Sequence, residues 1–169
     1  MNIFWLDDDL QLAAQYHNDK HCVKMIVEMN QVLSAAHHVL DGDESPIRDK
    51  IYRKTHVNHP CSVWVRESCW NYTMVYDLAL RLCDEYTYRY GKVHKCQTDV
   101  MLALARLPNN IPMVASTPKP ACMPDECKIY VDGKLDVVAS YRNYYNVAKR
   151  SLAVWKNRNV PEWYTGELK

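Results

Sequence analysis

Glycine and phenylalanine are scarce in this chain of 169 residues, which has four Gly and one Phe. Loops that cradle phosphate groups depend on glycine, and the motifs GxxxxGK[ST], GxGxxG, GxSxG and HExxH are all missing. No apolar run approaches the roughly 20 residues that a membrane span needs. The N-terminus also lacks the charged, apolar and small-residue sections of a signal peptide. We therefore expect a cytoplasmic protein with no membrane partner and no glycine-rich phosphate loop.

A strong excess of positive charge is missing as well, because the net charge is only +1. Any contact with nucleic acid must then be local. The seven cysteines form an odd set without a CxxC pair, which indicates reduced thiols rather than a disulfide framework. Cys122 and Cys127 could bind zinc together with a histidine, but their spacing is not a standard one. We expect no metal and no cofactor.

What the chain does contain predicts one all-α domain over residues 1–169. The hydrophobic fraction is 48% and charged residues make up 24%, as in a globular domain of this length. Strand signals are poor, and only residues 1–5 and 128–131 could pair, as a minor element. Residues 1–6 (MNIFWL) predict an extended segment packed on the core, which would place the α-amino group near the interior.

The central element is a predicted helix from Asp9 to Leu40, free of Gly and Pro and followed by Gly42. At about 100° per residue, one narrow stripe collects its polar side chains, with apolar residues on both sides. This stripe holds His17, His21, Lys24, Glu28, Gln31 and His38. It predicts a polar band that lines an internal cleft. The alternatives are a set of satisfied buried hydrogen bonds or simply the solvent-exposed side of the helix.

Other helices are predicted from capping and periodicity. They are Ser62 to Tyr90, capped by Ser62 and ended by Gly91; a short helix capped by Thr98 and running to Arg106; and Val137 to Asn157, capped by Asp136. Five prolines between positions 108 and 124 exclude regular structure there and predict a wrapped loop or a lid.

Three places carry candidate ligand-binding chemistry. Residues 140–160 contain no acid and interleave tyrosines with cations, which suits a ligand with phosphates and bases. The helix end EYTYRYG and the turn THVNHP are the other two. The residues expected to bind substrate are Lys24, Gln31, His59, Arg89, Arg142, Tyr145, Lys149 and Arg150. Each place has an alternative interpretation. Residues 140–160 could be a docking helix with core aromatics, EYTYRYG an ordinary helix end with cations near its dipole, and THVNHP a turn with a helix cap.

The polar stripe also suggests roles in catalysis. His17 and His21 are candidate general acid and base, and Glu28 is a candidate electrostatic stabiliser. Lys24, one turn before Glu28, either pairs with that carboxylate or binds a substrate phosphate. Two histidines one turn apart could instead hold a metal, but HxxxH alone is a weak signature. A metal-free acid/base site is the simpler hypothesis.

Short pieces of the chain resemble the pyrimidine-dimer DNA glycosylases of the endonuclease V type. These short pieces are LAAQYH (12–17), NHP (58–60), EYTYRYG (85–91) and PEWY (161–164). The combined pattern HNDKHCVKM, THVNHP, EYTYRYGK and YRNYYN with WKNR is similar, over most of the chain, to a group of small phage proteins.

The resemblance to the glycosylases implies a compact all-helical fold. It also implies attack by the N-terminal amine on the sugar C1′, a Schiff base and strand cleavage. Asn2 is not a small residue, so Met1 is expected to be retained and its amine would be the nucleophile. Glu28 is the nearest carboxylate for stabilising the sugar cation, and His17 is the residue that matches the family's first helix.

We therefore expect a DNA glycosylase/AP lyase with Met1, His17, His21 and Glu28 as its catalytic residues. Its partner would be DNA or a nucleotide, in the host cytoplasm if the chain is phage-encoded. An enzyme or binding protein for a small signalling nucleotide, and a non-catalytic inhibitor of a host protein, are the alternatives. The sequence gives no oligomeric state.

Overall fold

The computed structural model describes residues 1–166 and confirms an all-α architecture, with 55% of the chain helical. Its α-helices are α1 (Leu10–Tyr16), α2 (Asp19–Leu40), α3 (Pro60–Arg66), α4 (Cys69–Tyr90), α5 (Lys95–Thr98), α6 (Val100–Leu104) and α7 (Val137–Ala148). Short 3₁₀ turns are η1 (Gly42–Glu44), η2 (Arg48–Lys50), η3 (Asp125–Cys127) and η4 (Arg150–Leu152). Strands β1 (Ile129–Val131) and β2 (Lys134–Asp136) form an antiparallel hairpin. Among the described residues, no helix is long and apolar enough to cross a membrane.

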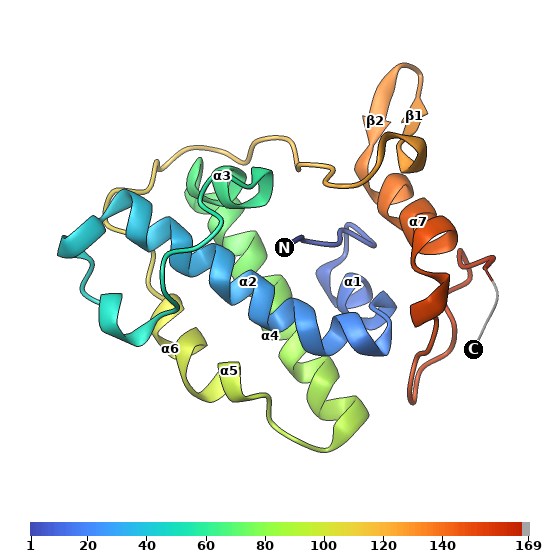
Figure 1. Ribbon diagram of the computed structural model, residues 1–169, viewed down its shortest axis with the longest axis horizontal. Helices are drawn as coiled ribbons and strands as arrows, with labels where there is room; N and C mark the ends of the chain where they lie inside the picture. The colour runs from blue at the N-terminus through green and yellow to red at the C-terminus, as the bar shows by residue number, and fades with distance from the viewer. Residues whose placement is uncertain (167–169) are drawn as a thin grey trace.

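Helices α2 and α4 form the centre of the molecule (Figure 1). α3 packs on α2, α1 packs on α4, and α6 lies against α2. Met29 and Leu33 of α2 and Val75 and Leu82 of α4 are fully buried in the shared core. Burial of each such side chain contributes roughly 1.5–3 kcal/mol. This packing holds α2, the helix that carries Glu28, in a fixed position.

The prediction of one continuous helix from Asp9 to Leu40 is wrong at one point, because the chain breaks between α1 and α2. His17 has extended backbone angles (φ −61°, ψ 132°), and the Asn18 side chain accepts a hydrogen bond from the His21 N–H at 2.9 Å. Asn is a strong N-cap residue that competes with the helical backbone, so the helix restarts there. His17 therefore does not lie on the helix that carries Glu28.

The predicted helix from Ser62 to Tyr90 is likewise two helices. α3 begins at Pro60, with His59 as its N-cap, so Ser62 lies inside the helix and does not cap it. Ser68 is extended (φ −155°) and caps α4 by accepting from the Trp70 N–H. The predicted end at Gly91 is confirmed, since Gly91 has a left-handed conformation (φ 63°) that favours glycine.

Further predicted boundaries need correction. The short helix predicted from Thr98 to Arg106 is divided into α5 and α6, on either side of Asp99. The last helix ends at Ala148 rather than Asn157, although its predicted cap, Asp136, accepts from the Ala139 N–H at 2.9 Å. The two predicted strand segments do not pair with each other, since the partner of β1 is β2.

The predicted irregular segments are confirmed. The proline-rich chain from residue 107 to 124 contains no helix or strand and passes over α3 on its way to the hairpin (Figure 1). Ile3, Phe4, Trp5 and Leu6 are buried in the core as an extended lead-in. This segment places the N-terminus beside α2 and α3 (Figure 1).

Candidate functional site

The N-terminal amine meets Glu28 of α2. The Met1 nitrogen lies 3.6 Å from Glu28 Oε2, and the Asn2 backbone N–H donates to the same oxygen at 2.8 Å. The Met1 side chain is only 2% exposed, whereas the residue as a whole is partly exposed. The exposed surface of Met1 therefore belongs mainly to its backbone. The amine of a half-buried residue thus lies beside the carboxylate of a buried one.

Lys24 completes this group from one helical turn earlier on α2. Its Nζ lies 3.0 Å from Glu28 Oε1, while its side chain is 63% exposed. Glu28 thus faces two cationic groups, one on each carboxylate oxygen. Because Lys24 is exposed, it can leave the pair to meet an anionic ligand at little cost.

Asn2 fixes the N-terminus against the rest of the molecule. Its side-chain amide donates to the Cys122 carbonyl at 2.7 Å, and its Oδ1 accepts from the Tyr141 hydroxyl at 2.8 Å. The Tyr141 hydroxyl also accepts from the Cys122 N–H at 3.1 Å. This closed network joins the N-terminal segment, the proline-rich chain and α7. The network positions the amine, although the amine takes part in none of its hydrogen bonds.

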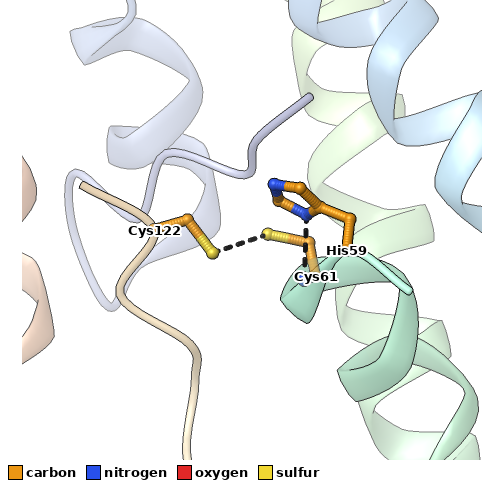
Figure 2. Close-up of side chains that lie close together, drawn as sticks. All are labelled: His59, Cys61 and Cys122. Carbon is orange, nitrogen blue, oxygen red and sulfur yellow. Dashed lines mark hydrogen bonds between the residues drawn. The ribbon is translucent and has the colours of Figure 1, made fainter. Parts of the chain in front are cut away.

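A second cluster lies beside the first and contains His59, Cys61 and Cys122 (Figure 2). Their possible ligand atoms all lie within 4.8 Å of one another, and the two sulfur atoms are 3.6 Å apart. His59 Nδ1 accepts from the Cys61 N–H at 3.2 Å. In the described part of the chain, this is the one group of three or more His, Cys, Asp or Glu residues with metal-binding geometry.

Burial and neighbouring charge perturb the ionisation of this cluster. The pKa of His59 is lowered first by burial and then by the positive N-terminus. The hydrogen bond between the two thiols raises the pKa of Cys61, together with burial, and lowers that of Cys122. Cys122 is therefore the thiol of the pair that loses its proton more readily.

His17 and His21 lie in an aromatic cluster rather than beside Glu28. The His21 ring packs on Phe4 at 4.4 Å between centroids, and its Nδ1 lies 2.6 Å from the Tyr145 hydroxyl. His17 Nδ1 donates to the Ala13 carbonyl at 2.7 Å. Burial lowers the pKa of His17 to about 4 and that of His21 to about 3. Both rings are therefore neutral at pH 7.

Arg89 is a buried structural cation. Its guanidinium contacts Glu85 at 2.6 Å, Asp19 at 2.9 Å and the Gln15 carbonyl at 2.8 Å, and its side chain is fully buried. Arg158 binds the other oxygen of Glu85 at 2.8 Å. The donors of Arg89 are thus already engaged in joining α4, α1 and α2.

The cations of α7 and of the turn that follows it differ in whether they are paired with an acid. Arg142 is paired with Asp7 at 2.6 Å and donates to the Leu6 carbonyl, so it ties α7 to the lead-in. Lys149 Nζ lies 4.7 Å from the Tyr144 ring, and the exposed Arg150 donates to the Asn146 carbonyl. Within residues 1–166, neither Lys149 nor Arg150 forms an ion pair with an acid.

Two lysines lie four residues apart near the start of α2, at positions 20 and 24. Burial lowers the pKa of His21 first, and the charges of His17, Lys149, Lys24 and Lys20 add to that lowering. Lys20 and Lys24 are exposed. Gln31 lies half-buried on α2, three residues beyond Glu28. This face therefore presents local positive charge on a nearly neutral molecule.

The structure thus brings together four of the predicted site residues, Met1, Lys24, Glu28 and His59. Three further residues of this region were not predicted as site residues from the sequence, namely Asn2, Cys61 and Tyr141. Cys122 lies beside Cys61 and not, as the sequence analysis considered, in a metal set with Cys127. The one local signal for the cysteine was NHPC, in which Cys61 directly follows the turn that contains His59. No family model, curated protein sequence or solved structure matches this chain.

Proposed function

We propose that this protein is a DNA glycosylase/AP lyase whose nucleophile is the Met1 amine. The observation that carries the proposal is the 3.6 Å approach of that amine, on the partly exposed Met1, to the buried Glu28. An amine nucleophile needs a group that accepts its proton and a site that a sugar carbon can enter. The resemblance to pyrimidine-dimer glycosylases also implies an N-terminal amine as nucleophile and a carboxylate beside it.

Glu28 has two roles in this chemistry. Its Oε2 accepts a proton from the amine, which frees the nitrogen lone pair for attack on C1′ of the target nucleotide. The glycosidic bond breaks as the new C–N bond forms, and its electron pair leaves with the base, which takes up the proton that Glu28 received. Glu28 is then a carboxylate again and faces the positive charge of the sugar adduct.

The lyase step follows from the same covalent bond. The sugar ring opens with O4′ as leaving atom, which takes a proton and leaves a Schiff base between C1′ and the Met1 nitrogen. Loss of a proton from C2′ then expels the 3′-phosphate and cuts the strand. Water releases the product and restores the amine.

Lys24, Lys20 and Lys149 are the proposed phosphate contacts, because Lys20 and Lys24 are exposed on α2 and Lys149 lies over the Tyr144 ring. Tyr144, under the Lys149 ammonium, offers a partly buried aromatic face beside them. His17, His21, Tyr145 and Arg89 take no direct part in this proposal, because their polar groups are engaged inside the fold. A flat base over aromatic and cationic groups is the usual arrangement for an unstacked nucleotide.

Borohydride trapping tests the proposal. The protein, with an unmodified Met1 confirmed by mass, is incubated with ultraviolet-irradiated DNA and with abasic-site DNA in the presence of borohydride. We expect a covalent adduct with both, and its loss when the amine is acetylated. No adduct and no strand cleavage with either DNA would reject the proposal, and a thermal-shift screen of free nucleotides would then test the alternative substrate class.

A further inference from the structure

We infer that His59, Cys61 and Cys122 form a binding site for one thiophilic divalent cation, Zn²⁺ in particular. The sequence predicts no metal, because the spacing of Cys122 and Cys127 is not a standard one and HxxxH is a weak signature. The ligands inferred here come instead from two segments, with Cys61 and Cys122 61 positions apart. The inference goes beyond the proposed glycosylase chemistry and stands independently of it. It rests on the side-chain arrangement in Figure 2.

The spacing of the sulfur atoms fits tetrahedral zinc. With Zn–S bonds of about 2.3 Å at tetrahedral angles, two sulfurs lie roughly 3.8 Å apart. Cys61 Sγ and Cys122 Sγ are 3.6 Å apart. A sulfur and an imidazole nitrogen on the same ion lie roughly 3.6 Å apart, and all three ligand atoms lie within 4.8 Å. An ion thus needs only small side-chain movements.

The ligands are held by structure that does not depend on the ion. His59 and Cys61 flank Pro60 at the start of α3, which fixes their relative position. Cys122 is fixed on both sides of its backbone, since its N–H donates to Tyr141 and its carbonyl accepts from the Asn2 amide. Outer hydrogen bonds of this kind orient metal ligands.

The chemistry of the set selects the ion. Two thiolates and an imidazole suit Zn²⁺ and disfavour Mg²⁺ or Ca²⁺, which prefer oxygen ligands. Cys61 is fully buried, whereas His59 and Cys122 are partly exposed. A three-residue set of two cysteines and one histidine leaves a fourth position open on the exposed side, as in zinc sites that bind water or a ligand.

The ligands are not equivalent. His59 Nδ1 already accepts the Cys61 N–H, so coordination through Nδ1 competes with that bond, whereas the sulfurs give up only their contact with each other. We therefore expect Cys61→Ser and Cys122→Ser to weaken binding by more than 100-fold, above the roughly 10–100-fold typical of an outer partner. We expect His59→Gln to weaken it less than either cysteine change. Tyr141→Phe, which removes the hydroxyl that positions Cys122, should cost roughly 10–100-fold.

The test uses the full chain with its thiols kept reduced. The protein is stripped with a chelator, then titrated with Zn²⁺ for stoichiometry and with Co²⁺ for its absorption spectrum. We expect one ion per chain and the sulfur-to-cobalt charge-transfer and d–d bands of a tetrahedral thiolate site. Cys127→Ser is the matched control, because Cys127 is a buried cysteine of the same region outside the cluster, and it should bind normally.

Each outcome decides the inference. Wild-type protein that takes up no zinc and shows no thiolate–cobalt bands would overturn it. Wild-type zinc affinity in Cys61→Ser and in Cys122→Ser would also overturn it. Acetylation of the Met1 amine should abolish borohydride trapping while leaving zinc stoichiometry unchanged. The metal site and the amine chemistry can therefore fail separately.

Discussion

Glu28 is the residue on which the proposed chemistry depends, because it accepts from the Asn2 N–H and faces both the Met1 amine and Lys24. Glu28→Gln keeps an oxygen for the Asn2 N–H but removes the negative charge. We expect the rate of adduct formation to fall by about 10²–10³-fold, while the free energy of unfolding changes by about 1 kcal/mol or less.

Single-turnover trapping, with urea denaturation alongside, measures both quantities for Glu28→Gln. Glu126→Gln provides the control, since Glu126 is an exposed acid on η3. Trapping by Glu28→Gln at the wild-type rate would remove Glu28 from the mechanism.

Three buried histidines make stability depend on pH. Burial lowers the pKa of His17 and His37 to about 4 and that of His21 to about 3, from the usual 6.5. Between pH 6.5 and 4 the unfolded chain therefore binds protons that the folded chain does not. The free energy of unfolding should fall on acidification by about 1.4 kcal/mol per pH unit for each histidine, or about 4 kcal/mol for all three.

Urea midpoints between pH 7.5 and 5 measure this slope, and histidine ring resonances followed by NMR identify the groups. The sign is fixed by the direction of the pKa shifts, since stability is highest above pH 6.5 and is lost below it. A midpoint that stays constant or rises as the pH falls to 5 would contradict burial of these rings as neutral groups.

At the scale of single residues, the sequence predicted short-range relations between side chains better than the role of each side chain. The one-turn spacing of Lys24 and Glu28 predicted their pairing, and the apolar lead-in predicted an interior position for the amine. The roles of His17 and His21 could not be separated in the same way, because a helical projection assumes one helix. The Asn18 cap turns His17 away from α2, and only tertiary packing shows that Phe4 and Tyr145 enclose His21.

At the scale of elements, buried charge joins α4 to its neighbours. Arg89 bridges Glu85 and Asp19, and both its side chain and that of Glu85 are fully buried. Arg89→Met leaves the Glu85 charge short of a partner inside the protein. We expect a loss of about 3–5 kcal/mol in the free energy of unfolding.

Thermal and urea denaturation test the Arg89 prediction, with Arg81→Met as control on the exposed side of the same helix. The control should change stability by about 0.5 kcal/mol or less. If Arg89→Met instead kept its stability and lost affinity for DNA, Arg89 would be a substrate contact, as the sequence suggested, and not a structural cation.

The elements themselves were predictable where local chemistry is strong. Gly91 and Asp136 mark real helix ends, because a left-handed glycine and an N-cap carboxylate act locally. The hairpin also had a signal that went unused, since Asp132 and Gly133 both have positive φ (49° and 74°), as an Asp-Gly hairpin turn requires. Breaks at Asn18 and Ser68 were missed because hydrophobic periodicity continues across each cap.

At the scale of the whole molecule, the candidate site lies where four segments meet. Residues 1–2, α2, the start of α3 and the chain around Cys122 come together beside α7 (Figure 1). The all-α class followed from periodicity and the lack of strand signals. The convergence of Met1, Glu28, Cys61 and Cys122 did not, because it depends on the long-range route of the proline-rich segment. Sequence spacing carries no information about such a route.

Mapping the reduced adduct to one atom is the measurement that tests the central claim most directly. Wild-type protein is trapped on abasic-site DNA with borohydride, digested with nuclease and protease, and sequenced by tandem mass spectrometry. The proposed chemistry predicts the sugar remnant on the α-nitrogen of Met1. A remnant on Lys24, which faces the same carboxylate, or no modified peptide at all, would contradict the claim that the N-terminal amine is the nucleophile.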